Sequence, residues 1–406
     1  MNTAFARTAL SPLHFKSAEG LVAQTSSLLY RGFPIRKTSD SSSPTRRRAE
    51  AALWPAALII ALAALSPSCF AAEPAPNSFW VCVSNEKSGD VTVIDGSKNS
   101  VVATIPVGKR PRGLHPSPDG KLLYVALSGS PITGPPPLDA QGNPIQRKGK
   151  DDDDDDKNSD HSADGIGVVD FQQKELLKKL PAGSDPEQFA VSADGTRLYI
   201  SNEDVGTVSI LNASNGKVEH IIPVKKEPEG VTLTPDGRFV YVTCETGGEI
   251  FVIDTAASKS IAQFTVGGRP RTVVFLPDGT RAFVPSESAG TLHYVDSVNH
   301  KLLKTIQLPP GSRPMGTAMA ADGKKLYVST GRGGAVCVID TATQEVLSSI
   351  KTGGRPWGLG ISPDGKALYV ANGPSNDVSV IDLSSQKEIT RVKAGEGPWG
   401  IAIVTP

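Results

Sequence analysis

PWGLGISPDGKALYVANGPSNDVSVID, residues 356–382, is the stretch that decides the fold. It opens on a Pro-x-Gly segment, turns at Asp364-Gly365, and continues with LYVAN and VSVID, in which apolar and other residues alternate. Alternation with a period of two predicts half-buried β-strands, and an Asp-Gly pair beside such runs predicts a hairpin. The stretch therefore predicts short antiparallel strands joined by tight turns.

This cassette recurs along the chain. Four short strands in about 42 residues are typical of one blade of a β-propeller. The successive spacings of the first proline are 75, 42, 42, 44, 42 and 42 residues. That proline falls at Pro111, Pro186, Pro228, Pro270, Pro314, Pro356 and Pro398.

The two ends of the repeat region are complementary. Residues 79–106 supply the second, third and fourth strands of a unit, and residues 398–406 supply a first strand and nothing more. Joined, they complete a seventh blade and remove the exposed edges that an open array would present. An open β-solenoid would not need such half-repeats. We therefore predict an all-β fold: a seven-bladed β-propeller of four-stranded antiparallel blades, closed by a C-terminal strand that completes blade 1.

Residues 1–72 carry the pattern of a leader followed by a secretory signal. Arg46 to Arg48 precede an apolar run, residues 51–65, and small residues follow it, with cleavage expected after Ala71 or Ala72. A membrane anchor is the alternative, but about 15 apolar residues are fewer than the roughly 20 that a span needs. The prediction is a periplasmic or secreted propeller over residues 73–406, with no membrane span after cleavage.

The long first spacing places an insert at about residues 130–164, in blade 2. It contains PITGPPP and six consecutive aspartates, Asp151 to Asp156. A single-sign block beside Pro and Gly predicts a disordered, solvated loop. A calcium loop of the EF-hand type is disfavoured, because Ser159 stands where the required glycine would be.

Charge and cysteine content exclude several functions. The chain has 42 basic and 42 acidic residues, and 34 and 39 of these follow residue 72, which leaves a net charge of −5. Most of that excess is the aspartate run, so no nucleic-acid binding is expected. The cysteines are Cys69, Cys82, Cys244 and Cys337, without a C-x-x-C pair, and we predict buried strand residues and neither a disulfide framework nor a metal site.

The candidate site is one mouth of the ring. The loop before strand one and the loop between strands two and three share a face, so the Pro-x-Gly segments lie with the glutamates that follow the second strands. Fixed charges beside an apolar wall suit a small anionic or aromatic ligand, or a protein partner's loop. Alternatively, Arg and Glu of adjacent blades pair to hold the ring together. The residue after each proline is Trp399, Arg112, Glu187, Glu229, Arg271, Met315 or Trp357.

His115 is an outlier in the inner strand. Other blades place Ala190, Thr232, Val274, Ala318, Gly360 or Ala402 in the same slot. A titratable base or ligand there is one interpretation. The interpretation favoured on sequence alone is a hydrogen-bonded histidine between blades.

The repeats resemble the YVTN-repeat β-propellers, since the strand that names them reads YVAN at 369–372, YISN at 199–202 and YVTC at 241–244. VSNEKSGDVTVID, SDPEQF and GPSNDVSVID are similar to exported propellers encoded with PQQ-dependent alcohol catabolism. This resemblance implies an accessory role in periplasmic quinoprotein-linked catabolism. The Asp-rich insert departs from the pattern.

Two functions follow from these patterns. The first is a monomeric, non-enzymatic binding or scaffold module without a cofactor, its ligand or partner held at the charged mouth. The alternative is a lactonase, because other seven-bladed propellers hydrolyse lactones at this mouth with His, Glu and Arg, and His115, Arg112, Glu187, Glu229 and Arg271 supply those groups. A haem-dependent redox protein is disfavoured, because the chain has no C-x-x-C-H motif.

Overall fold

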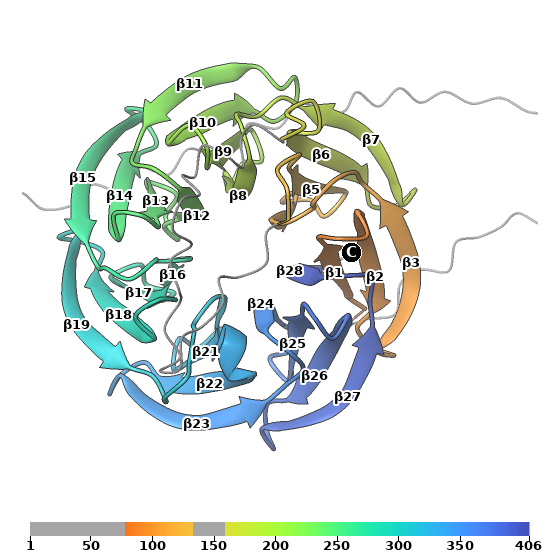
Figure 1. The fold of residues 1–406 in the computed structure, drawn as a ribbon, viewed down its shortest axis with the longest axis vertical. Helices are drawn as coiled ribbons and strands as arrows, with labels where there is room; N and C mark the ends of the chain where they lie inside the picture. The colour runs from red at the N-terminus through yellow and green to blue at the C-terminus, as the bar shows by residue number, and fades with distance from the viewer. Residues whose placement is uncertain (1–77, 133–158, 406) are drawn as a thin grey trace, which may run out of the picture. The chain divides into compact units, whose positions relative to one another are not determined.

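The computed structural model of the chain describes residues 78–132 and 159–405. Their strands form seven four-stranded antiparallel sheets around a central axis, as Figure 1 shows. The predicted seven-bladed propeller is thus confirmed. The predicted leader, its cleavage site and the aspartate run lie outside the described residues and stay predictions.

Blades 1 to 4 follow the chain, each beginning at its innermost strand. Blade 1 contains β28 (Pro398–Val404), β1 (Trp80–Asn85), β2 (Asp90–Asp95) and β3 (Ser100–Pro106). Blade 2 contains β4 (Leu114–Pro116), β5 (Leu122–Leu127), β6 (Gly165–Asp170) and β7 (Glu175–Leu180). Blade 3 contains β8 (Pro186–Val191), β9 (Arg197–Asn202), β10 (Thr207–Asn212) and β11 (Val218–Pro223). Blade 4 contains β12 (Pro228–Leu233), β13 (Phe239–Cys244), β14 (Glu249–Asp254) and β15 (Lys259–Thr265).

Blades 5 to 7 continue in the same order. Blade 5 contains β16 (Val274–Phe275), β17 (Arg281–Ser286), β18 (Thr291–Asp296) and β19 (Lys301–Gln307). Blade 6 contains β20 (Thr317–Met319), β21 (Lys325–Ser329), β22 (Ala335–Asp340) and β23 (Glu345–Lys351), with a short 3₁₀ helix, η1 (Gly331–Gly333), between its second and third strands. Blade 7 contains β24 (Pro356–Ile361), β25 (Ala367–Asn372), β26 (Asp377–Asp382) and β27 (Lys387–Lys393).

The ring closes as the complementary half-repeats predict. β28 pairs antiparallel with β1, and Cys82 stands opposite Ala402. The insert begins after β5 and ends before β6, which places it in blade 2, between the second and third strands.

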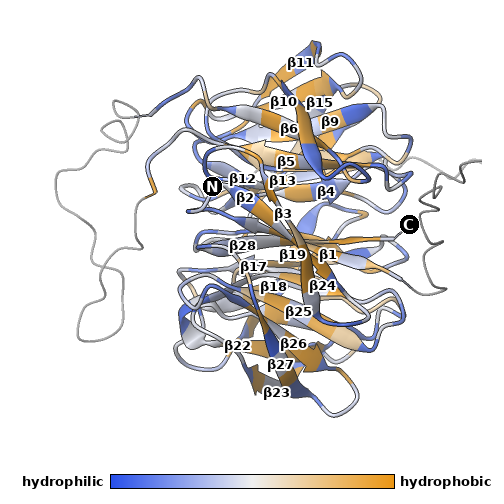
Figure 2. Cartoon of the chain, turned by 90° about the vertical axis from the view of Figure 1, so that its right-hand side faces the viewer, coloured by the Kyte–Doolittle hydropathy of each residue, from blue (hydrophilic) through white to orange (hydrophobic). Residues whose placement is uncertain are grey.

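The core lies between neighbouring sheets. The side view in Figure 2 shows apolar strands across the thickness of the ring and polar loops at both faces. Tyrosines of the second strands fill the gaps between blades, and their hydroxyls hydrogen-bond to the adjacent blade. Tyr241 donates to the carbonyl of Ser297 at 3.1 Å, and Tyr369 donates to that of Gly96 at 3.0 Å. The buried apolar faces and these hydrogen bonds together hold each blade against the next.

The Pro-x-Gly segment has two structural roles. In β8, β12, β24 and β28 the pairing shifts directly after the proline, so the residue after the proline sits at a β-bulge. Bulges re-aim side chains and recur beside active sites. The glycine makes room for the next blade: a Cβ on Gly358 would lie 2.6 Å from the carbonyl oxygen of Trp399, and one on Gly400 would lie 2.6 Å from that of Arg112.

In four blades a hydroxyl of the second strand donates to the carbonyl of the residue that follows the next blade's proline. Ser84 donates to the carbonyl of Arg112 at 2.6 Å, and Ser329 donates to that of Trp357 at 2.6 Å. Ser201 and Thr243 donate in the same way to the carbonyls of Glu229 and Arg271. Glu229 and Trp357 are therefore held both by their own bulge and by a hydroxyl from the preceding blade.

Cys82, Cys244 and Cys337 are buried free thiols, as predicted, while Cys69 lies outside the described residues. Burial raises the pKa of all three thiols, which keeps them protonated. Within the described chain, no helix has both the length and the apolar character that a transmembrane span requires.

Candidate functional site

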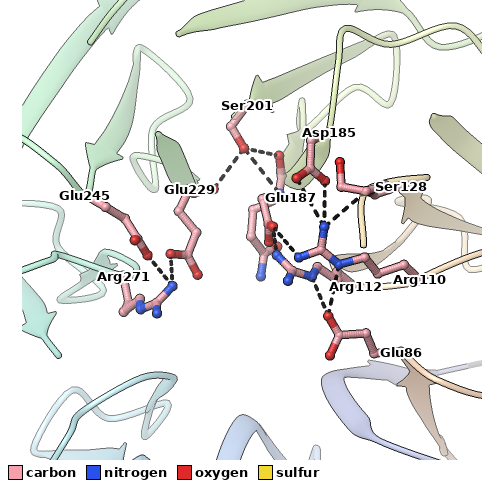
Figure 3. Close-up of polar contacts among 12 residues, drawn as sticks. Glu86, Arg110, Arg112, Ser128, Asp185, Glu187, Ser201, Glu229, Glu245 and Arg271 are labelled. Carbon is pink, nitrogen blue, oxygen red and sulfur yellow. Dashed lines mark hydrogen bonds and ion pairs between the residues drawn. The ribbon is translucent and has the colours of Figure 1, made fainter. Parts of the chain in front are cut away.

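Charged side chains from five adjacent blades meet at one mouth of the ring. The residues after the blade prolines supply one set, and Glu86, Glu203, Glu245 and Glu287, which directly follow β1, β9, β13 and β17, supply the other. We call this face the charged mouth. Figure 3 shows that its ion pairs form two separate groups.

The first group, the Arg112 cluster, consists of Glu86, Arg110, Arg112, Asp185 and Glu187. Arg112 Nε lies 3.0 Å from Glu86 Oε1, and its Nη1 contacts Glu187. Arg110 reaches Glu86 Oε1 at 3.2 Å and Asp185 Oδ2 at 3.1 Å. Both arginines therefore join blade 1 to blade 3 across blade 2, which confirms that Arg and Glu of adjacent blades pair.

The second group, the Arg271 cluster, consists of Glu229, Glu245, Arg269, Arg271 and Glu287. Arg271 forms ion pairs with all three glutamates of this group, and its Nε donates to Glu287 Oε2 at 2.8 Å. Arg269 donates from Nε to Glu245 Oε2 at 2.6 Å. A guanidinium has five N–H donors, so these contacts leave one Nη2 hydrogen of Arg271 for another acceptor.

An aromatic wall lies beside both clusters. The rings of Trp357 and Trp399 are 5.3 Å apart and inclined at 45°. The guanidinium of Arg112 lies 5.6 Å from the Trp399 ring, and that of Arg271 lies 5.9 Å from the Trp357 ring. Cation–π contacts of this kind orient both groups. With the buried Met315, the two indoles form what we call the tryptophan wall.

A cavity of about 250 Å³ brings most of the predicted site residues together. At roughly 30 Å³ for each water, it accommodates about eight waters, or one small organic molecule. Arg112 and Glu187 do not line it and lie beside it in the Arg112 cluster. Gln188, which the sequence analysis did not single out, lines the cavity from the position that is glycine in most blades. The predicted residues in its lining are His115, Glu229, Arg271, Met315, Trp357 and Trp399.

His115 lies in the central channel, where it lines this cavity and a wider one of about 550 Å³ toward the opposite mouth. Its ring packs edge-on against Phe189 of the next blade, at 4.9 Å between centroids. In the part of the chain that the structure describes, its nitrogens form no hydrogen bond. Burial lowers the pKa of His115 to about 4, so the imidazole is neutral near pH 7. His115 therefore packs between two blades, as expected, and also faces the channel, while the expected hydrogen bond is not made by any described residue.

Burial and neighbouring charges shift the pKa values of the carboxyl groups of the mouth in opposite directions. Burial raises the pKa of Glu229 well above its usual value, and Glu245 adds to this while Arg271 opposes it. Burial would also raise the pKa of Glu245, but Arg271 and a hydrogen bond from Glu229 hold it at about 2. Burial thus favours the protonated form of Glu229, whereas Arg271 favours the ionised form of Glu245, and such divergent pairs identify acid and base assignments.

The carboxylates of Asp185, Glu187 and Glu203 converge, with oxygens within 4.8 Å of one another. Arg110 is already ion-paired with Asp185 and approaches Glu187 at 3.7 Å. Burial and the charge of Asp185 raise the pKa of Glu203 to about 8, so this carboxyl is protonated near neutral pH. The three groups are therefore explained as the acidic side of an ion-pair network.

A second cluster near the insert resembles a nucleophile triad in composition only. Ser184 Oγ and Asp164 Oδ2 each lie 3.0 Å from the same nitrogen, Nδ1 of His161. A Ser-His-Asp triad uses the two ring nitrogens separately, one toward each partner. Ser184 also donates to Asp204 at 2.6 Å. This arrangement does not activate a serine.

Residues 225–397 match the model of the family "Lactonase, 7-bladed beta-propeller". This stretch contains Glu229, Arg271, Met315 and Trp357. No curated protein matches the chain. The similarity to YVTN-repeat propellers and to the PQQ-associated group stays a prediction.

Solved structures share the propeller fold at low sequence identity. Hydrazine synthase of Kuenenia stuttgartiensis is 20% identical over 73% of this chain and 95% of its own, with a TM-score of 0.59. A candidate 6-phosphogluconolactonase of Bacteroides uniformis is 17% identical over 81% of this chain and 100% of its own, with a TM-score of 0.63. Another from Bacteroides fragilis is 19% identical over 81% and 98%, with a TM-score of 0.62.

These findings correct the first functional prediction. A non-enzymatic binding or scaffold module is wrong, because the lactonase family match favours the hydrolase alternative. The repeat pattern could not weigh the two, since one propeller fold serves many activities and function depends on the site. The predictions of a monomer and of no cofactor stay untested.

Proposed function

We propose that this protein is a lactone hydrolase whose substrate lies in the cavity between the Arg271 cluster and the tryptophan wall. The observation that carries this proposal is a single cavity lined by Glu229, a carboxyl whose pKa is raised by burial, by the guanidinium of Arg271, and by the neutral imidazole of His115. The lactonase family match supports it.

Hydrolysis requires a proton acceptor, a group that stabilises negative charge, and a proton donor. Water must lose a proton as it adds to the lactone carbonyl, and His115 accepts that proton because its imidazole is neutral. The carbonyl oxygen becomes negative, and the remaining Nη2 hydrogen of Arg271 stabilises it. The ring oxygen then departs and takes the proton of Glu229. The product is an open-chain hydroxy acid.

The tryptophan wall supplies the apolar surface that a lactone ring requires. Ligand sites are mostly apolar cavities with a few placed polar groups, which describes this lining. The indole nitrogen of Trp399 is buried and has no hydrogen-bond partner among the described residues.

The direct test is acid release by the full chain from a panel of γ- and δ-lactones at constant pH. We expect turnover on at least one lactone, and we expect His115→Gln to lower kcat by about 10²-fold or more, as for loss of a general base. Absence of turnover across the panel, or wild-type kcat in His115→Gln, would contradict the proposal.

A further inference from the structure

Six arginines stand directly before or after the blade prolines, and one of them differs from the rest. Arg110, Arg112, Arg269 and Arg271 all form carboxylate ion pairs, and Arg313 donates to the carbonyl of Ser288. The sixth is Arg355. Across residues 78–132 and 159–405 it has no carboxylate oxygen within 4.0 Å and donates no hydrogen bond.

Arg355 is nevertheless partly buried. Its guanidinium lies 4.7 Å from the centre of the Trp357 ring, the shortest of the arginine–tryptophan contacts in the described mouth. Burial lowers its pKa, and the charges of Arg271 and Arg332 act in the same direction, against Glu287. A guanidinium stays protonated in spite of such shifts. Glu287 and Glu86 attract Arg355 only from beyond ion-pair distance, so the described mouth holds a partly desolvated cation without a direct ion-pair partner, which a bound anion would stabilise.

The backbone at Arg355 adopts a conformation that recurs before the blade prolines. Arg355 has a φ of 48°, in the left-handed region that L-residues seldom adopt, and the other residues before blade prolines with such a φ are Arg110, Asp185, Glu227 and Arg269. Glycine takes the same position before Pro398, with a φ of 70°. A strained backbone that carries a charged side chain is a recurrent feature of functional sites.

The arginines of the two clusters are already paired with carboxylates. Arg271 contacts three glutamates, and Arg112 contacts two, so their charge is largely neutralised inside the protein. A dianionic phosphate would meet these carboxylates and one guanidinium without an ion-pair partner among the described residues, Arg355, which packs on the cavity-lining Trp357. A carboxylate carries one charge and matches the fork of one guanidinium.

We infer that Arg355 binds a single carboxylate substituent of the substrate, so that the site selects lactones carrying one carboxylate over uncharged and phosphorylated lactones. The ring of such a substrate packs on the tryptophan wall, and its carboxylate reaches past the edge of Trp357 to the guanidinium. This inference rests on the proposed lactone hydrolysis.

The kinetic test uses 5-oxotetrahydrofuran-2-carboxylate, its uncharged carboxamide and 6-phosphoglucono-δ-lactone as substrates of the full chain. We expect Arg355→Met to raise KM for the carboxylate roughly tenfold or more, with kcat nearly unchanged, and to leave kcat/KM for the carboxamide within about twofold. Arg355→Lys should restore part of the preference. The wild type should use the phosphorylated lactone less well than the carboxylate.

A binding measurement separates this inference from the proposed function. Calorimetry with cyclopentanecarboxylate, which cannot be hydrolysed, should show binding that weakens roughly tenfold in Arg355→Met. Arg355-dependent binding without turnover of any lactone would contradict the hydrolase and keep the anion site. Lactone turnover with equal use of the acid and the amide, unchanged in Arg355→Met, would overturn the anion site and keep the hydrolase.

Discussion

Single residues of the mouth have diverged from a common repeat position. The slot after each blade proline holds Arg, Glu, Met or Trp, although the backbone around it repeats. Glu187 and Glu229 occupy the same repeat position, but their surroundings give them different contacts. Glu187 is an ion-pair partner of Arg112 and does not line the cavity, whereas Glu229 lines it and has its pKa raised by burial. Position in the repeat places the residue, and its neighbours decide its chemistry.

The acidity of two residues predicts the pH dependence of activity. His115 must be neutral to accept a proton, so kcat/KM should rise with pH through about 4, the pKa of His115. Glu229 must be protonated, so kcat/KM should fall only at a pH above the usual range of a carboxyl group. The expected profile is a plateau between these two limits, measured by acid release and corrected for spontaneous lactone hydrolysis. Activity that already falls within the usual titration range of a glutamate would contradict these roles.

Residue identities alone could not identify the site completely. The sequence predicted which side chains face the mouth, because the loop positions of a four-stranded blade are fixed by its topology. It left open which arginine meets which glutamate, since a pairing depends on side-chain reach across blades. Arg355 stands directly before a blade proline, as Arg110 and Arg269 do, so the sequence does not distinguish the three, and it favoured a hydrogen-bonded histidine between blades for His115. Gln188 was missed although it replaces the usual glycine, and that replacement was the available signal.

At the scale of the element, the Pro-x-Gly segment explains how the site is positioned. The bulge turns the middle residue toward the mouth, and the missing side chain of the glycine admits the carbonyl of the next blade. The motif was visible in the sequence as a repeat. Its role in packing could not be predicted from the sequence, because the close contact joins residues of two blades that lie 42 positions apart in the chain.

Substitution of the glycine tests this interpretation. In Gly358→Ala the new Cβ would lie 2.6 Å from the carbonyl oxygen of Trp399, and backbone of blade 1 must move. We expect a loss of about 1–3 kcal/mol in the free energy of unfolding, measured by chemical denaturation. Gly373→Ala is the matched control in the same blade, since its nearest neighbour is 3.6 Å away. Equal stability of the two variants would refute the close-packing role.

At the scale of the whole molecule, the ring is a closed array in which the first blade depends on both ends of the repeat region. β28 covers the edge of β1 and also contributes Trp399 to the site. Period, turn signals and complementary half-repeats predicted this closure from the sequence. The strand that closes the ring, β28, therefore also supplies a residue of the site.

Removal of that strand should open the ring. A chain ending at residue 397 leaves β1 with an unpaired edge, which favours aggregation. We expect a lower Tm and soluble aggregates in light scattering. A circular permutant that carries residues 398–405 ahead of β1 should keep the native Tm, since the same blade is rebuilt. A monomeric truncated protein with native Tm would show that closure is dispensable.

In the proposed hydrolysis, Glu229 donates a proton to a lactone held against the tryptophan wall. This role is tested by kcat of Glu229→Gln beside that of Glu187→Gln, which makes the same change in the neighbouring blade but outside the cavity. We expect kcat to fall about 10²-fold or more in Glu229→Gln and to stay within about threefold of the wild type in Glu187→Gln. Equal effects of the two substitutions, or full activity of Glu229→Gln, would contradict this role.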